Sequence, residues 1–149
     1  MSTYTTQAAI LGEIQMKDLV SLTDDSPSTG TLNVDVLNQV IANASGYIDR
    51  KIANIYGQQL PFNPVPLSVS SMALTVACYR LYRRRLVPDE KNIFYPDFKD
   101  VEMFLNKVNT GELHLDDVPS RDFPQGAMTG QPTIYGNQPF GSGPIVNTM

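Results

Sequence analysis

The sequence predicts an all-α protein, a small bundle of four to five helices, two of them long, followed by an extended carboxy-terminal arm. Apolar residues recur at steps of three and four along several stretches, which is the period of a helix that is buried on one side. Segments rich in proline and glycine separate these stretches, and strand-like alternation is not convincing anywhere in the body. We therefore expect a helical domain over residues 1–117 and an arm over 118–149.

Two short helices are expected near the amino terminus. The first covers about 6–11 and breaks at Gly12, and the second covers 13–22 with an apolar stripe that ends at Leu22. The following segment, TDDSPSTGT, is rich in proline, glycine and small hydroxyl residues, which favour turns. It should therefore separate the second helix from the next one.

The longest predicted helix spans 34–56. Asn33 or Asp35 can cap its start, and Gly57 stands where a carboxy-terminal capping glycine belongs. The spacing of its apolar residues places them on one face. These residues are Leu37, Ile41, Ala44, Ile48, Ile52 and Ile55.

Two further helices, 67–86 and 95–109, follow a stiff loop that contains three prolines. Pro88 stops the first of them and Gly111 ends the second, after which a short extended piece at 112–115 is compatible with the sequence. The predicted buried stripe of 67–86 consists of Leu67, Leu74, Ala77, Cys78, Leu81 and Tyr82. That of the last helix consists of Phe94, Phe98, Val101, Leu105 and Val108.

Composition limits the kinds of partner. The formal net charge of -4 argues against a general affinity for nucleic acid or acidic membranes. Hydrophobic residues make up 42% and charged residues 17%, which is little charge for a free monomer and indicates surfaces covered by partners. No signal peptide and no membrane-spanning stretch is visible. We expect a cytosolic protein, or a particle assembled in the cytosol, without a membrane partner.

The sequence offers no arrangement of residues for catalysis, so we expect no enzyme, no cofactor and no metal site. Its single cysteine, Cys78, and single histidine, His114, lie far apart, which argues against a zinc site or a nucleophile–base pair. Cys78 is predicted in the core and His114 at the surface or an interface. The segment DDSPSTG fits neither register of a calcium loop. The paired acids at 89–90 and 116–117 are predicted to be solvated.

The densest charge lies in CYRLYRRRL, which contains Arg80, Arg83, Arg84 and Arg85. Three interpretations remain open at this stage. The arginines can form the solvated last turn of a helix, where cations suit the helix dipole. They can dock acidic groups of a neighbouring subunit or portal protein, because arginine is favoured at interfaces. They can also contact nucleic acid.

The arm combines turn-forming residues with isolated apolar side chains. Ordering about ten of its residues costs roughly 10–20 kcal/mol, and burying six apolar side chains returns roughly 9–18 kcal/mol. We therefore expect the arm to order when a partner's sheet edge supplies backbone hydrogen bonds, with PTIYGNQPF and GPIVNTM as the best strands. The alternative is a flexible end. The candidate contact residues are Met128, Ile134, Tyr135, Phe140, Ile145 and Val146.

Five stretches in order resemble the Mu-type family of small helical phage proteins from the head-morphogenesis gene cluster. They are YTT, LVSLTDD, ANASGYIDRKIANIYGQQLPF, VPLSVSSMALTVACYRLYRRR and FKDVEMFLNKVNTGELHL. The resemblance covers about 4–116, and that family is similar to the head–tail connector (adaptor) proteins of long-tailed bacteriophages. The proline loop and the arm are longer here than is common in the family.

The resemblance implies a structural ring, usually a dodecamer, beneath the portal at the head–tail neck of the virion. Such a ring extends the DNA channel, lets genomic DNA pass without sequence-specific binding, and docks the next neck or tail protein. The implied partners are thus other copies of the chain, the portal protein and the next neck or tail protein. Two alternatives remain: another neck or tail-completion protein, such as a stopper, and a small helical nucleic-acid-binding regulator.

Overall fold

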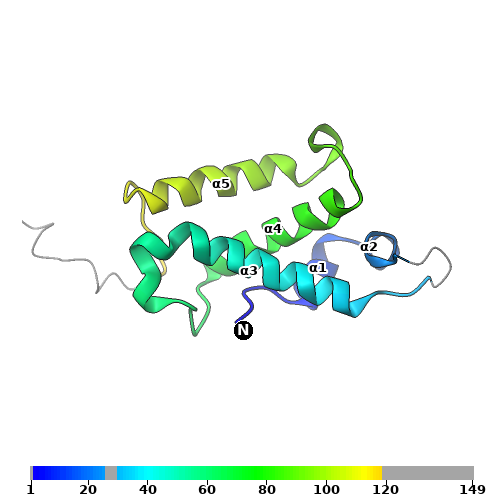
Figure 1. Cartoon of the computed structure of the whole chain (residues 1–149), viewed down its shortest axis with the longest axis horizontal. Coiled ribbons are helices and arrows are strands. Elements are labelled where there is room, and N and C mark those ends of the chain that lie inside the picture. Colours follow the sequence, from blue (N-terminus) through cyan, green and yellow to red (C-terminus); the bar gives the residue numbers. More distant parts are fainter. Residues whose placement is uncertain (1, 26–29, 119–149) are drawn as a thin grey trace, which may run out of the picture. The chain divides into compact units, whose positions relative to one another are not determined.

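The computed structural model describes residues 2–25 and 30–118, and within these ranges the secondary structure is entirely helical. Five α-helices and two short 3₁₀ helices follow one another (Figure 1). They are α1 Gln7–Glu13, α2 Met16–Thr23, α3 Val34–Tyr56, η1 Gly57–Gln59, α4 Leu67–Arg84, η2 Asp89–Lys91 and α5 Tyr95–Asn109. The predicted all-α class is confirmed, with α3 and α4 as the two longest helices.

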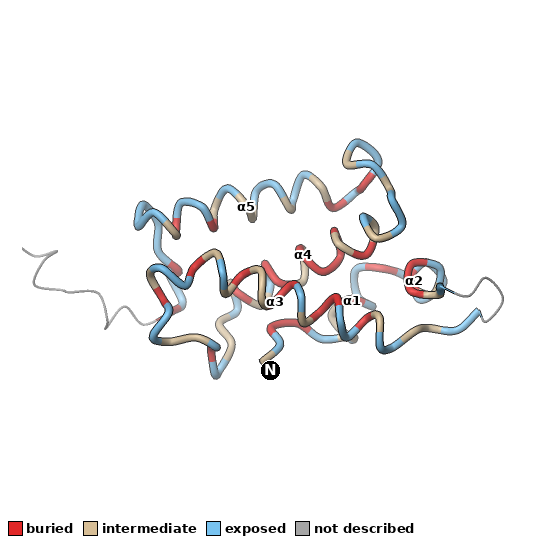
Figure 2. Tube along the Cα trace, viewed as in Figure 1, coloured by how far each residue is buried: buried red, intermediate tan, exposed pale blue. Residues whose placement is uncertain are grey.

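Helix α4 is the centre of the bundle. Helices α1, α2, α3 and α5 all pack against it, and α3 also packs along α5. Figure 2 shows buried positions concentrated on α3 and α4, whereas α5 is largely exposed and fully buries Leu105 and Val108. Each fully buried aliphatic side chain contributes about 1.5–3 kcal/mol, so the packing around α4 dominates the stability of this part of the chain.

The amino-terminal helices differ from the prediction at their junction. The Thr6 hydroxyl accepts a hydrogen bond from the Ala9 amide at 3.1 Å and caps α1. The helix then runs through Gly12, where the predicted break is wrong, because a glycine on the solvent side interrupts no packing. Helix α2 begins at Met16, three residues later than predicted, because the backbone of Ile14 is extended and ends α1.

Both ends of α3 lie where the sequence placed them. Asn33 caps the start, and its side-chain oxygen accepts a hydrogen bond from the Val36 amide at 3.1 Å. At the other end Gly57 occupies the predicted cap position, with a right-handed φ of -52°. The chain then tightens into η1, because a 3₁₀ turn is another way to satisfy the last carbonyls of a helix.

The proline loop after η1 is fixed to the body through aromatic side chains. Phe62 is buried, and its amide donates to the Tyr4 hydroxyl at 3.2 Å. That hydroxyl in turn donates to Asp49, and the Tyr4 amide donates to the Ser45 hydroxyl at 2.9 Å. Burial, followed by the hydrogen bond to Asp49, raises the pKa of Tyr4. Tyr4 therefore links the segment before α1 and the proline loop to α3.

The buried surface of α4 is wider than the single predicted stripe. Leu67 is 81% exposed, so its predicted place in the core is wrong, and Val69 begins the buried surface instead. Because several helices surround α4, residues on most sides of it are covered. The helix ends at Arg84, two residues earlier than predicted, and Leu86 follows with a left-handed φ of 60°.

Helix α5 has the predicted bounds and ends in a Schellman motif. The Glu112 amide donates to the Lys107 carbonyl at 2.9 Å and the Gly111 amide donates to Val108 at 3.0 Å, with Gly111 at φ 83°. The segment 112–115 forms no strand. The predicted arm lies outside the described residues, apart from Val118, so the arm and the domain boundary at 117 stay predictions.

Candidate functional site

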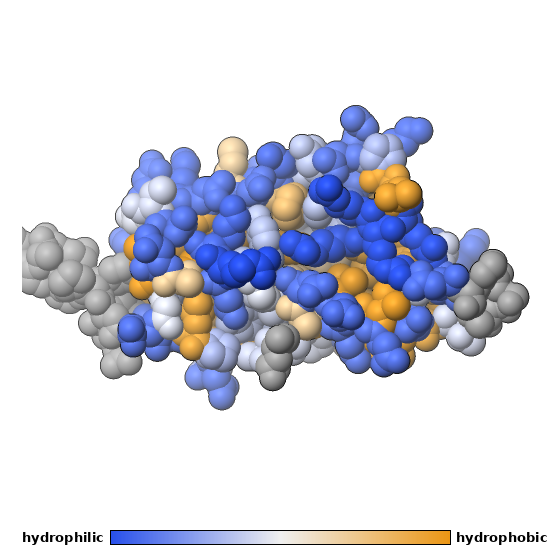
Figure 3. Space-filling model, in the orientation of Figure 1, coloured by the Kyte–Doolittle hydropathy of each residue, from blue (hydrophilic) through white to orange (hydrophobic). Residues whose placement is uncertain are grey.

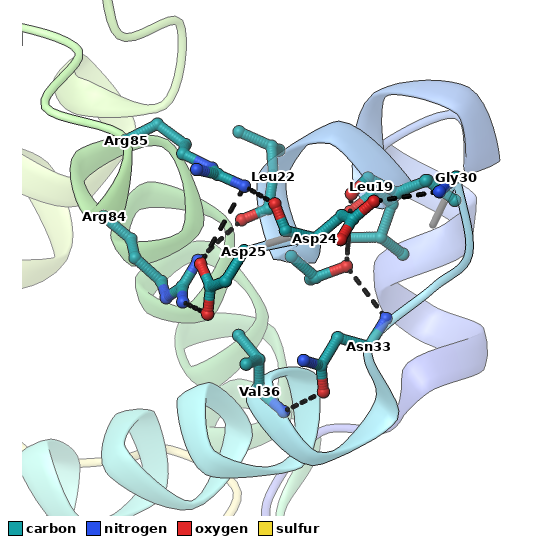
Figure 4. Close-up of polar contacts among 11 residues, drawn as sticks. Leu19, Leu22, Asp24, Asp25, Gly30, Asn33, Val36, Arg84 and Arg85 are labelled. Atoms are coloured by element: carbon teal, nitrogen blue, oxygen red, sulfur yellow. Dashed lines mark hydrogen bonds and ion pairs between the residues drawn. The ribbon is translucent and has the colours of Figure 1, made fainter. Parts of the chain in front are cut away.

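The arginines at the end of α4 fall into two pairs that face different surroundings. Arg84 and Arg85 reach the loop that follows α2 (Figure 4). Arg80 and Arg83 reach aromatic side chains of α3 and α4. The partners of Arg84 thus differ from those of Arg80 and Arg83.

Arg84 and Arg85 are held within the molecule. An Nη1 hydrogen of Arg84 is donated to the Leu22 carbonyl at 3.0 Å, and Nη2 forms an ion pair with Asp25. Arg85 donates to the Asp24 carbonyl and lies 3.9 Å from the Asp25 carboxylate. The hydrogen bond from Arg84 lowers the pKa of Asp25. This pair therefore joins the end of α4 to the end of α2.

The described ends of the α2–α3 connection form a compact polar corner (Figure 4). The Thr23 hydroxyl donates to the Leu19 carbonyl at 2.9 Å and accepts the Asn33 amide at 3.2 Å. The Asp24 carboxylate accepts the Gly30 amide at 3.0 Å, where Gly30 has φ 60°. Polar side chains here bond to nearby backbone, as expected of a turn with helix caps. The middle of the turn, 26–29, lies outside the described residues.

Arg80 rests on an aromatic ring and has no acidic partner among the described residues. Its guanidinium carbon lies 5.3 Å from the centroid of the Tyr47 ring, and the Lys51 ammonium lies 5.7 Å from the same ring. The Arg80 Nε and the Tyr47 hydroxyl are buried without a hydrogen-bond partner in the part of the chain described. Burial, followed by the like charge of Arg50, lowers the pKa of Arg80.

Arg83 is oriented by a hydroxyl group. Its Nη1 donates to the Tyr79 hydroxyl at 3.0 Å, and that hydroxyl donates to Asp89 at 3.0 Å. The Tyr79 ring stacks on Phe98 with a centroid distance of 4.0 Å and an interplanar angle of 9°, and Phe98 lies 6.0 Å from Tyr47. Tyr47, Phe98 and Tyr79, which we call the aromatic cluster, thus join α3, α5 and α4 beneath two arginines.

The remaining sequence candidates lie apart from this region. Cys78 is fully buried in the core, as predicted, and burial raises the pKa of its thiol to about 12, so the thiolate is disfavoured at neutral pH. His114 is exposed. Within 2–25 and 30–118 no group of three or more His, Cys, Asp or Glu side chains could hold a metal ion.

Large aliphatic side chains stand exposed at both ends of α4. Leu86 is 89% exposed and Ile93 is 70% exposed, both in the connection to α5. At the other end Leu67 borders an apolar recess of about 370 Å³ whose lining includes Phe104 and Leu115. On the face seen in Figure 3, apolar atoms form separate small patches within a hydrophilic surface. The body therefore offers several small contact areas and no single large one on that face.

The six apolar arm residues predicted to contact a partner lie outside the described residues, so their role stays a prediction. They are Met128, Ile134, Tyr135, Phe140, Ile145 and Val146.

Sequence reasoning singled out the arginines but missed the aromatic residues that orient them. Tyr47 and Arg80 lie on different helices, and no local pattern joins two residues so far apart in sequence. The spacing of Tyr79 and Arg83, one helical turn apart, was the one available signal, because side chains four residues apart are neighbours on a helix.

Comparison with known proteins gives the family. No helix within the described ranges combines the length and the apolar character needed to cross a membrane. No curated protein matches the chain. Residues 4–130 match the family described as bacteriophage Mu, Gp36, a range that includes the five described α-helices and most of the 149 residues. This match confirms the predicted Mu-type phage family, and the chain belongs to the bacteriophage Mu Gp36 family.

Proposed function

We propose that this phage protein is a structural head-to-tail connector, or adaptor, of a tailed bacteriophage. It forms a ring beneath the portal at the neck of the virion, extends the DNA channel and docks the next neck or tail component. Membership of a bacteriophage family and a wholly helical described body support this proposal. Family membership supports a structural or assembly role in a phage. The surface of the body supports the more specific connector role.

The observation that carries the proposal is the exposure of large aliphatic side chains on a body that has a complete core. Leu86 and Leu67 are the most exposed of them, at 89% and 81%, and they lie near opposite ends of α4. Apolar surface of this kind suits contacts with other chains, because burial on assembly removes it from water. A ring subunit with neighbours on two sides needs contact areas at separate places.

The proposed role is not enzymatic and needs no cofactor. The partners are other copies of the chain, the portal protein and the next neck or tail protein. Genomic DNA passes through the channel without sequence-specific binding, which is consistent with the net charge of -4, because negative walls do not retain a negative polymer.

In this proposal the arm joins the ring to its neighbour. Its apolar residues and extended segments suit strand addition to a partner's sheet edge. Many arms bound at once make a firm joint from weak single contacts. Deleting 128–149 should leave the helical circular-dichroism spectrum unchanged and release the neck ring from the particle. Unchanged particle assembly and stability after this deletion would show that the arm has no such role.

Cryo-electron microscopy of intact particles tests the function directly. The expected result is a ring of this chain between the portal and the next neck component. A ring one position further from the portal would identify a stopper, which is the alternative neck protein. Particles that lack the chain would contradict both roles.

A further inference from the structure

We propose that Arg80 and Arg83, with Arg50 beside them, form a docking site for carboxylate groups of a second copy of this chain. The proposal rests on the ring proposed above and names one of its contacts. Arg84 and Arg85 are not part of this site, because they bond to the end of α2 and the loop that follows it.

The first observation is that none of these three arginines forms an ion pair with a described carboxylate. Within the described residues, Arg50 and Arg80 form no ion pair or hydrogen bond through their side chains. Arg83 bonds to the Tyr79 hydroxyl, and Asp89, which accepts from that hydroxyl, offsets part of its charge. The electrostatic neighbours of Arg80 are two other arginines and two tyrosines. Positive charges gathered in this way are stabilised when a carboxylate arrives, because it relieves their mutual repulsion.

The second observation is that the two main arginines are already held in place. The Tyr47 ring supports the guanidinium of Arg80, and the Tyr79 hydroxyl fixes Arg83. Phe98 packs between the two tyrosines and ties both supports together. A preorganised guanidinium loses less freedom when it binds, which favours carboxylate recognition at an interface.

The open end of Arg80 suits a ligand that approaches from outside. Its Nε is buried, whereas its two terminal nitrogens are not among the buried atoms and make no hydrogen bond with described residues. A planar guanidinium presents its terminal N–H groups as a fork that matches the two oxygens of a carboxylate. The buried Nε and the Tyr47 ring anchor the other end of the group.

The exposed start of α5 supplies matching acidic groups. Asp97 and Asp100 are exposed, lie three residues apart on one helix, and form no ion pair among the described residues. Arg80 and Arg83 are also three residues apart on a helix, so both pairs have a separation of about 5–6 Å between Cβ atoms. The same spacing and opposite charge favour a head-to-tail contact between copies, which is the kind that closes into rings.

A protein carboxylate fits this site better than the phosphates of DNA. The site comprises three arginines within a chain of net charge -4, whereas a DNA-binding surface spreads cations along the duplex. Arg80 is half-buried against Tyr47, which suits a short side chain that enters the site more than a continuous phosphate backbone.

Sedimentation velocity of the purified full chain over a range of concentrations tests the proposal. The double variant R80E/R83E should raise the concentration needed for self-association by about tenfold or more, because like charges then face each other. The matched control K17E/K107E makes the same change of net charge at two exposed lysines outside the site, and it should associate like the wild type. Circular dichroism checks that every variant keeps its helices.

Charge exchange makes the test specific. D97K/D100K alone should also weaken association, and combining it with R80E/R83E in one chain should restore it. Equal self-association of the wild type and the R80E/R83E variant would overturn the docking site while leaving the proposed connector intact. A wild-type chain that stays monomeric at every concentration would overturn the docking site, and the absence of a ring from particles would overturn the connector as well.

Binding of a short DNA duplex, followed by fluorescence anisotropy, tests the nucleic-acid alternative. We expect no binding that depends on these arginines. If R80E/R83E abolished duplex binding and left self-association unchanged, the site would belong to nucleic acid and the proposal would be wrong.

Discussion

Two pairs of arginines at the end of α4 behave differently. Arg84 and Arg85 meet carbonyls and a carboxylate from the end of α2, and they tie two segments of the chain together. Arg80 and Arg83 meet an aromatic ring and a tyrosine hydroxyl, so their orientation is fixed while neither forms an ion pair with a described carboxylate. The first pair is used within the fold, and the second is available to a partner.

The comparison shows that a helix can separate identical side chains by small differences in position. Arg83 and Arg84 are adjacent in sequence but point about 100° apart around the helix axis, so they face different neighbours. One pair points to the polar end of α2 and the other to the aromatic cluster. The consequences differ for stability, for pH dependence and for assembly, and each can be measured.

Removing the support of the second pair should have the largest effect. Tyr79→Ala deletes a buried ring that stacks on Phe98 and holds Arg83, and we expect a loss of about 3–5 kcal/mol in the free energy of unfolding. Tyr79→Phe keeps the ring, removes the hydroxyl and should cost about 0.5–1.5 kcal/mol. Urea denaturation measures both. Equal losses would mean that the hydrogen bonds, and not the stacked ring, support the pair.

Breaking the first pair should have a moderate effect. Arg84→Ala removes the hydrogen bond to the Leu22 carbonyl, which contributes about 0.5–1.5 kcal/mol. Arg84→Lys keeps the charge but loses the two-pronged guanidinium that reaches both Leu22 and Asp25. Its free energy of unfolding should therefore lie between those of Arg84→Ala and the wild type. Thermal unfolding of the two variants and the wild type checks this order.

The first pair should also give a stability that depends on pH. The pKa of Asp25 is lowered in the folded protein, mainly by the hydrogen bond from Arg84, so its contribution is present above the unfolded pKa of about 3.9 and is lost as pH falls through the folded value. Asp25→Asn should therefore be less stable than the wild type at pH 6, and the difference should shrink as pH falls through the folded pKa of Asp25. A difference that does not change with pH would point to a cause other than ionisation.

Removing a charge from the second pair should change stability least. Arg80→Met keeps an unbranched side chain beside Tyr47 and removes a half-buried charge that forms no ion pair with a described acid, so the free energy of unfolding should stay within about 0.5 kcal/mol of the wild type or rise. Denaturation of the isolated chain measures this. A loss as large as that of Arg84→Ala would mean that Arg80 supports the fold, and the contrast between the pairs would disappear.

Helix bounds were predictable where local signals agree. α3 lies between the capping Asn33 and the proline loop, and α5 ends at Gly111, which takes the left-handed conformation that glycine favours. The prediction was less successful at Gly12 and at the end of α4. There the solvent side of a short helix tolerates glycine, and Leu86 takes a left-handed φ that sequence alone does not suggest for leucine.

The candidate site was partly predictable. The arginine-rich stretch is visible in the sequence, but its division into two pairs depends on Asp25 and Tyr47, which lie on other segments. Likewise, the buried surface of α4 exceeds one stripe because four helices surround it, and a periodic pattern describes a helix that is covered on one side.

By itself the sequence determined the helical class, the long helices and the residues able to form a core, because these follow from interactions within a few turns of chain. The tertiary structure decided that Leu67 is exposed, that Arg84 is bound and that Arg80 lies against Tyr47 without an acidic partner. These outcomes depend on which helices become neighbours, and that follows from the packing of the whole body and not from any one segment.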